Sequence, residues 1–382
     1  MDPTTADPAA APARLAERAE GWRRLARPLA LYLASRLVAL LALGLAATQT
    51  DRINLLGALA SWDGSSYVAI AQHGYPARVP ELAGHATFSS IAFFPLLPLL
   101  IRALALATGL RHLVAALIVS NLAGVIAALL LWRLVERIGD RDWADRSVAL
   151  FGVFPGALVL SMVYAEPLLL ALALGCLLAL LGRRWYAAGI LAALGTAARP
   201  NGLALVAACA AAAAPAVLRD RNWRALAAPA LAPLGGLAYL AYLWRHTGEP
   251  GAWFRVEREG WGQFFDFGAG TLRRAVHVLG GTRAYDDLLS TLGLVIVLML
   301  AGLMVRWRPP AAVWAYTGLV VLLAVGSSDL GPQPRFVLTA FPLLIAAARW
   351  VRGTAFAVLL GACGAGMVAY AVISIGALQV FP

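Results

Sequence analysis

The chain contains no lysine, only three cysteines and little charge for its length. Its 382 residues include 31 basic side chains, all of them arginine, and 20 acidic ones, so that 13% are charged while 61% are hydrophobic. A water-soluble domain of this size could not bury so much apolar surface, and the composition therefore predicts a membrane protein. The arginines behind the net charge of +11 lie in short connections between apolar runs. This pattern indicates orientation in a membrane and not nucleic-acid binding.

Several catalytic and metal-binding patterns are also missing. The sequence has no P-loop, no G-x-S-x-G elbow and no Rossmann glycine fingerprint, which excludes the classes that depend on them. Cys176, Cys209 and Cys363 lie inside apolar runs without metal-ligand spacing, so we expect small buried side chains. His73 and His85 have no second ligand at metal spacing, and the loops expected outside hold no Asp-x-Asp pair. We therefore expect no zinc site, and a metal-dependent reaction with a nucleotide sugar is disfavoured.

The apolar runs predict an all-α polytopic membrane protein with about 11 transmembrane helices. Each run is near the length that a bilayer needs, and the runs cover 28–48, 113–134, 147–164, 166–182, 186–199, 202–218, 225–245, 287–305, 311–326, 336–350 and 354–378. Arginine clusters occupy alternate connections, which predicts a cytoplasmic N-terminus. A span at 91–110 would invert every later loop. Since this segment also contains two prolines and an arginine, we interpret it as a juxtamembrane or re-entrant helix on the outer face.

The same pattern divides the chain into a short tail and one large domain. Residues 1–27 predict a cytoplasmic tail, disordered over 1–12, with an interfacial amphipathic helix after it. Residues 28–382 predict a single transmembrane domain with external loops at 49–112 and 246–286. Most of the unusual polar residues fall in external segments, so we expect the chemistry on the extracytoplasmic face. The composition, rich in alanine, arginine and leucine but free of lysine, favours the plasma membrane of a bacterium.

The most informative polar residue is Asp63, which follows the first apolar run. It lies between Trp62 and Gly64, with Tyr67 one helical turn further on. Asp-Gly is a common turn pair, and aspartate is a common N-cap, so a structural role is one interpretation. The flanking aromatic rings suit the headgroup level of a membrane. The other interpretation is a general base, because a sugar hydroxyl must lose its proton as a new bond forms.

Three further charged residues lie at expected external turns. Glu166 is either a helix N-terminal acid or a second acid that orients a substrate hydroxyl or an arginine in the same cavity. Arg199, in the sequence Arg199-Pro200-Asn201-Gly202, and Arg335 are either structural or bind a phosphate. The aromatic residues of loop 246–286 are either an interfacial belt or a binding platform for an acceptor glycan.

Together these segments resemble a known family. The resemblance rests on Trp62-Asp63-Gly64, Tyr67, Gly74-Tyr75, Ala92-Phe93-Phe94-Pro95, Tyr164-Ala165-Glu166, Arg199-Pro200-Asn201-Gly202 and Pro334-Arg335-Phe336. In order and in content they are similar to PIG-V-type mannosyltransferases, multi-span enzymes of the GT-C superfamily. The resemblance implies a GT-C-type bundle that uses polyprenyl-phosphate mannose, with the catalytic carboxylate of the first external loop at Asp63. It also implies a second acid at Glu166 and positions in the donor or acceptor cavity for Arg335, Arg199 and Asn201. We further expect Trp62, Tyr67, Tyr75 and His73 to contact the substrate.

The resulting hypothesis is an extracytoplasmic sugar transferase. Asp63 deprotonates the acceptor, and an arginine, with Arg335 the first candidate, stabilises the departing lipid phosphate. The partners are the lipid-linked donor, membrane lipids and a glycolipid, glycan or protein acceptor, but no nucleic acid. No cofactor is expected beyond the donor, although a divalent metal remains an open alternative. A transporter or flippase for a lipid-linked sugar and an inactive membrane scaffold are the competing hypotheses.

Overall fold

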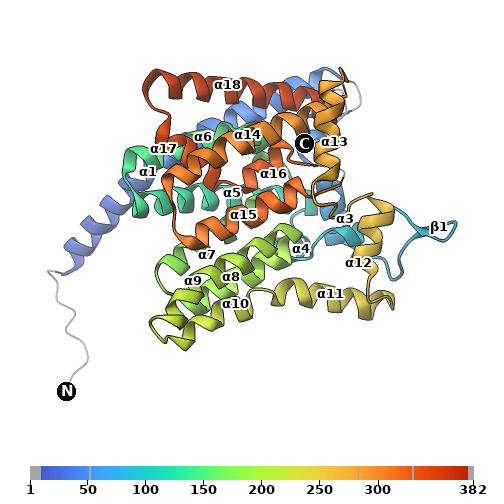
Figure 1. The fold of residues 1–382 in the computed structure, drawn as a ribbon, viewed down its shortest axis with the longest axis horizontal. Coiled ribbons are helices and arrows are strands. Elements are labelled where there is room, and N and C mark those ends of the chain that lie inside the picture. Colours follow the sequence, from blue (N-terminus) through green and yellow to red (C-terminus); the bar gives the residue numbers. More distant parts are fainter. Residues whose placement is uncertain (1–9, 51–52, 283, 329–330, 377–382) are drawn as a thin grey trace.

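The computed structural model describes residues 10–50, 53–282, 284–328 and 331–376 (Figure 1). Almost all of the regular structure in these residues is helical, as predicted. The exception is a small antiparallel hairpin of β1 (Glu81–Leu82) and β2 (His85–Ala86). Strands of two residues are too short to show an alternating pattern and therefore cannot be predicted from the sequence.

The helices run in the following order, with η marking 3₁₀- or π-helical segments. The first half contains α1 (Ala10–Thr48), α2 (Leu55–Leu59), α3 (Asp63–His73), η1 (Ser90–Ala92), α4 (Leu96–Thr108), α5 (His112–Ile138), α6 (Arg141–Val153), η2 (Pro155–Ser161), α7 (Glu166–Leu181), α8 (Trp185–Ala198), η3 (Pro200–Gly202) and α9 (Leu203–Leu218). The second half contains η4 (Trp223–Leu226), α10 (Ala227–Leu231), α11 (Leu234–Thr247), α12 (Ala252–Arg255), η5 (Val256–Gly260), α13 (Ala269–Leu279), α14 (Tyr285–Trp307), α15 (Ala311–Val325), α16 (Pro334–Thr339), α17 (Pro342–Trp350), α18 (Gly353–Ala371) and η6 (Val372–Gly376).

Within the described residues, six helical stretches are long and apolar enough to cross a membrane. They are Arg24–Thr48, His112–Ile138, Pro200–Leu218, Trp223–Thr247, Tyr285–Trp307 and Gly353–Gly376, and α6 with η2, bent by 80°, would make a seventh. Large side chains such as Leu37 and Leu41 are well exposed on α1, where lipid would cover them. The protein is therefore a multi-pass membrane protein. The predicted count of about 11 spans is not confirmed, because α7, α8 and α15 have only 16, 14 and 15 residues.

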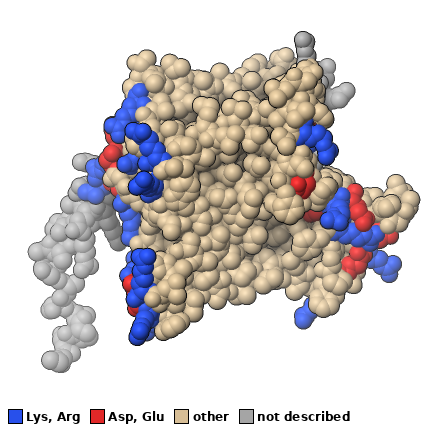
Figure 2. Space-filling model, viewed as in Figure 1, with Lys and Arg blue, Asp and Glu red and all other residues tan. Residues whose placement is uncertain are grey.

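The arginine-bearing connections meet at one end of the bundle. Arg183 pairs with Asp220, which joins the α7–α8 connection to the one after α9. Arg146 Nε donates to the Ala348 carbonyl at 3.0 Å, which links α6 to the end of α17. Figure 2 shows charged side chains along two opposite edges, separated by a broad band without charge. This is the arrangement expected of a protein whose middle lies in the hydrocarbon core.

The first helix differs from the prediction. The interfacial helix and the first span form one continuous helix, α1, that contains Pro28. Residues 1–9 of the predicted disordered tail lie outside the described residues. Further along α1, Arg36 is buried and donates to the Gly152 and Ala157 carbonyls, the latter at 2.7 Å. Arg36 is therefore a structural arginine that satisfies carbonyls at the bend between α6 and η2.

Helix α4 does not carry the chain from one end of the bundle to the other. Three residues separate α4 from α5, and in the first half of α5 Ser120 Oγ donates to the Tyr164 carbonyl close to Glu166. At its far end, Arg137 donates to the Leu181 carbonyl at the arginine-bearing connection between α7 and α8. Because α5 starts at the end where Glu166 lies, α4 ends on that side. Phe93 and Phe94, just before α4, line the same cavity as Asp63 and Arg199, so α4 also begins there.

Candidate functional site

Two acids and two arginines form a buried charge cluster. Arg335 Nη1 donates to Asp63 Oδ2 at 3.1 Å, across 272 residues of sequence. Arg199 Nη1 donates to Glu166 Oε2 at 2.7 Å and lies 3.8 Å from Asp63 Oδ2. Glu166 is fully buried, and Asp63 and Arg335 are 7% and 5% exposed. The formal charges of the four groups cancel, which is the condition under which charges can be buried at acceptable cost.

Helix ends position three of these groups. Asp63 is the first residue of α3, and Glu166 is the first residue of α7, followed by Pro167 at a position where proline favours a helix start. Arg199 directly follows the last residue of α8. Acids are stabilised at helix N-termini and cations at C-termini. The sequence therefore places each of these three charges where its own backbone dipole favours it.

The backbone beside Asp63 and Arg335 is constrained, which fixes the positions of both residues further. Trp62, just before Asp63, has φ of 58°, a conformation that side-chain-bearing residues rarely adopt. On the other side, Gly156 of η2 packs directly against the backbone of Pro334 and Arg335, where a Cβ atom would overlap the Pro334 carbonyl. Asp63 and Arg335, which form the 3.1 Å hydrogen bond, are therefore both held by a constrained backbone.

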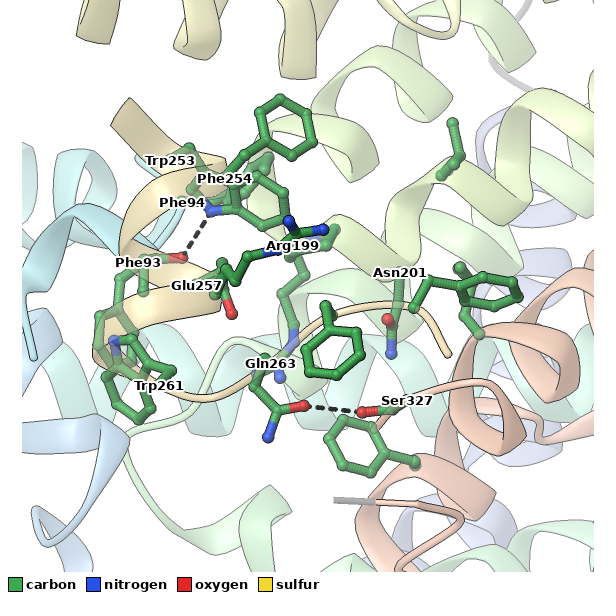
Figure 3. Close-up of a pocket in the computed structure, with 18 of the residues that line it drawn as sticks. Phe93, Phe94, Arg199, Asn201, Trp253, Phe254, Glu257, Trp261, Gln263 and Ser327 are labelled. Atoms are coloured by element: carbon green, nitrogen blue, oxygen red, sulfur yellow. Dashed lines mark hydrogen bonds between the residues drawn. The ribbon is translucent and has the colours of Figure 1, made fainter. Parts of the chain in front are cut away.

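A cavity of about 840 Å³ opens beside the cluster. Asp63, Arg199 and Arg335 line it together with Tyr67 and Asn201. Its other walls are largely aromatic, formed by Phe93, Phe94, Trp253, Phe254, Trp261, Phe264, Phe265 and Phe336 (Figure 3). Charged groups at one side and apolar rings around them are suited to a ligand that has both an anionic head and apolar or sugar-ring surfaces.

Loop 246–286 covers this cavity and is tied to the first loop by one arginine. Arg255 donates to Glu81 at 2.7 Å, to Glu249 at 3.2 Å and to the Gly84 carbonyl at 3.0 Å, and it also pairs with Glu259. Glu259 in turn accepts from the Ala86 amide at 2.7 Å, which lowers the pKa of this exposed carboxylate. This arginine clamp holds the β1–β2 hairpin against α12 and η5.

Glu257 is a cavity residue that the sequence did not single out. It lies in η5, and Figure 3 shows it extending toward Arg199. Burial raises the pKa of Glu257 to about 7, while Arg199 lowers it and Asp63 raises it. In the sequence it stands in the charged segment Arg255-Val256-Glu257-Arg258-Glu259, where nothing distinguishes Glu257 from Glu259.

The other predicted site residues fall into two groups. Tyr67 and Asn201 line the cavity, and Glu166 lies behind it, where it holds Arg199. Trp62, Tyr75 and His73 are not among the lining residues. Tyr75 donates to the Phe93 carbonyl at 2.7 Å and packs on Tyr239, while His73 is exposed at the end of α3. In the described part of the chain, no group of three or more His, Cys, Asp or Glu side chains could hold a metal ion.

Comparison with known proteins finds a family similar to part of the chain. Residues 36–217, slightly less than half of the 382, match the sequence model of the family described as mannosyltransferase (PIG-V). This match confirms the resemblance over these residues. The matched range includes Asp63, Glu166 and Arg199, whereas Arg335 and loop 246–286 lie beyond it. A search among curated proteins found no match.

Four solved chains are similar in structure. One is the oligosaccharyltransferase of Archaeoglobus fulgidus, crystallised with a tethered acceptor peptide that contains an NVT sequon. The similarity covers 91% of the present chain at 14% identity, with a TM-score of 0.43. The chain spans 55% of that oligosaccharyltransferase, and this similarity is too low to carry over a fold or an activity.

Replacing Gly156 by Ala is expected to lower hexosyl transfer at least about tenfold, because the new methyl group must displace the start of α16 and with it Arg335. The matched control is Gly318→Ala in α15, where a Cβ atom would meet nothing within 4 Å. Initial rates of the two purified variants provide the measurement. Equal rates would show that the contact between η2 and α16 does not position the arginine.

Proposed function

We propose that the protein is a GT-C-type mannosyltransferase that uses polyprenyl-phosphate mannose and transfers the sugar to a hydroxyl of an extracytoplasmic acceptor. The observation that carries the proposal is the contact between Asp63 and Arg335 at the edge of an aromatic cavity. A base for the incoming hydroxyl and a cation for the departing phosphate are the two groups that such a transfer requires.

In the proposed reaction, the donor phosphate binds to Arg335 and Arg199. Guanidinium groups suit phosphate because they can donate two parallel hydrogen bonds. Both arginines now contact Asp63 Oδ2, at 3.1 and 3.8 Å. A phosphate that draws these guanidinium groups toward itself frees the carboxylate for the acceptor. Arg199 keeps its second partner, Glu166, which holds its guanidinium in place.

The bond changes then follow from this placement. The acceptor oxygen attacks the anomeric carbon of mannose while Asp63 takes the hydroxyl proton. The bond between the anomeric carbon and the phosphate oxygen breaks, and its electron pair remains on the phosphate. The products are the mannosylated acceptor, polyprenyl phosphate and protonated Asp63, with inversion at the anomeric carbon. Arg335 and Arg199 offset the charge that develops on the leaving phosphate.

The distribution of arginine between the two ends of the bundle supports an extracytoplasmic site. The arginine-bearing connections gather at one end, and the positive-inside rule assigns such an end to the cytoplasm. The cavity is lined by residues 63, 199, 257 and 335, among others, and these four lie in the connections that do not carry the arginine clusters. The proposed membrane is the bacterial plasma membrane, with a glycolipid, glycan or protein as acceptor.

The test is a transfer assay with purified protein in lipid nanodiscs. Polyprenyl-phosphate mannose and an extract of bacterial membranes serve as substrates, and mass spectrometry records any acceptor that gains one hexose. We expect a mannosylated product together with released polyprenyl phosphate. If mannose crosses the bilayer of a proteoliposome without covalent transfer, the protein is a transporter and the proposal is wrong.

A further inference from the structure

Glu257 differs from Glu249 and Glu259 of the same loop, because its carboxylate has no ion-pair or hydrogen-bond partner among the described residues. Glu249 and Glu259 both pair with Arg255 in the arginine clamp. Glu257 lies between them in sequence, yet its carboxylate makes no ion pair or hydrogen bond with any residue that the structure describes. It lines the cavity instead, close enough to Arg199 and Asp63 for their charges to influence it. A carboxylate placed in this way is available for a ligand.

Two indole rings with fixed orientation share the cavity wall with Glu257. Trp253 donates its ring N–H to the Ala92 carbonyl at 3.2 Å, and Trp261 donates to the Ser89 carbonyl at 3.4 Å. The Trp261 ring also packs edge-on against Phe93, with centroids 5.5 Å apart. Because their polar atoms are already bonded to the first loop, these indoles offer the cavity mainly apolar ring surface.

A carboxylate next to aromatic rings matches the surface of a hexose. The ring hydroxyls donate hydrogen bonds to a carboxylate, and the C–H faces pack on indole. From this geometry we propose that Glu257 binds the hydroxyls of the sugar that is transferred, with Trp253 and Trp261 beside the sugar ring. The inference rests on the proposed function and adds to it a residue that recognises the sugar and not the lipid phosphate.

The position of Glu257 favours the donor sugar over a sugar of the acceptor. Arg199, which influences Glu257, is one of the two arginines proposed to hold the donor phosphate. The transferred hexose is joined to that phosphate through a single oxygen and must lie next to it. In Figure 3, Glu257 lies beside Arg199.

The experiment compares two ligands that differ only in the sugar. Farnesyl-phosphate mannose and farnesyl phosphate are titrated into the full-length protein in nanodiscs, and their dissociation constants are measured. For Glu257→Ala we expect the affinity for farnesyl-phosphate mannose to fall about 10- to 100-fold, the range for a lost hydrogen bond to a charged group. The affinity for farnesyl phosphate should change less than about threefold. Glu257→Gln keeps one acceptor oxygen and should show a smaller loss.

Glu249→Gln is the matched control, since it removes the charge of a loop acid that does not line the cavity. It should leave the ratio of the two affinities unchanged. If Glu257→Ala loses affinity equally for both ligands, the inference is overturned. It is also overturned if this variant binds both ligands normally but transfers the sugar more slowly, because Glu257 would then act on the acceptor. If the unsubstituted protein binds neither ligand, the proposed function fails and the inference fails with it.

Discussion

Replacing Asp63 by Asn should reduce mannose transfer by about 100- to 10,000-fold, the range that a positioned general base contributes. The amide has nearly the same size as the carboxylate and keeps an oxygen for Arg335, but it cannot take the proton of the acceptor hydroxyl. Donor binding should persist, because Arg335 and Arg199 remain. The measurement is the initial transfer rate, together with the affinity for farnesyl-phosphate mannose.

Asp145→Asn is the control for this result. Asp145 is 7% exposed, as Asp63 is, but lies away from the cavity, where it accepts from Trp132 Nε1 at 2.8 Å and pairs with Arg27. The Asp145→Asn variant tests whether removal of any buried carboxylate lowers the transfer rate simply by destabilising the protein. A rate for Asp63→Asn within a few-fold of the unsubstituted protein would remove Asp63 as the base.

Replacing Arg335 by Gln should weaken donor binding and reduce transfer even more strongly. Loss of a charge-assisted contact to the phosphate predicts a decrease of about 10- to 100-fold in affinity for farnesyl phosphate itself. Transfer should fall further, since the same cation stabilises the leaving group. This pattern separates the two residues, because the Asp63 variant binds donor without transferring sugar. Arg102→Gln removes an exposed arginine on α4 and should leave both quantities unchanged.

The thermal stability of the Arg335→Gln variant must be measured separately from its activity. Removing one partner of a buried ion pair typically costs about 3–5 kcal/mol, because the other charge stays buried without compensation. The double variant Asp63→Asn with Arg335→Gln removes both charges and should regain much of the lost thermal stability. It should regain no transfer activity. Recovery of transfer in the double variant would mean that the pair is structural only.

Much of the charge cluster could be predicted because polar residues are rare in this chain. Asp63, Glu166, Arg199 and Arg335 each interrupt an apolar region, and the high cost of burying a charge makes such positions conspicuous. Their meeting in space could not be derived, since 272 residues separate Asp63 from Arg335. Glu257 could not be predicted in this way, because it lies among other charged residues and is not conspicuous. Only the structure distinguishes it, since Glu249 and Glu259 pair with Arg255 and Glu257 does not.

Helical periodicity separates the residues of the first loop that line the cavity from those that do not. Asp63 and Tyr67 are four residues apart in α3 and lie on one face, so both reach the cavity. His73 is ten residues from Asp63, and Tyr75 follows the glycine that ends the helix. Closeness in sequence to Asp63 was therefore a poor guide. The bend between α6 and η2 was also missed, because hydropathy alone reads 147–164 as one continuous segment.

The unbroken first helix has a practical consequence. A helix of 39 residues is about 58 Å long, nearly twice the thickness of the hydrocarbon core of a bilayer. Its early turns stand clear of the bundle in Figure 1, on the side away from α3 and α12. A fluorescent protein or purification tag joined there would be held at a distance by a stiff spacer. Such a fusion should report on the enzyme in living cells without obstructing the entry of its substrates.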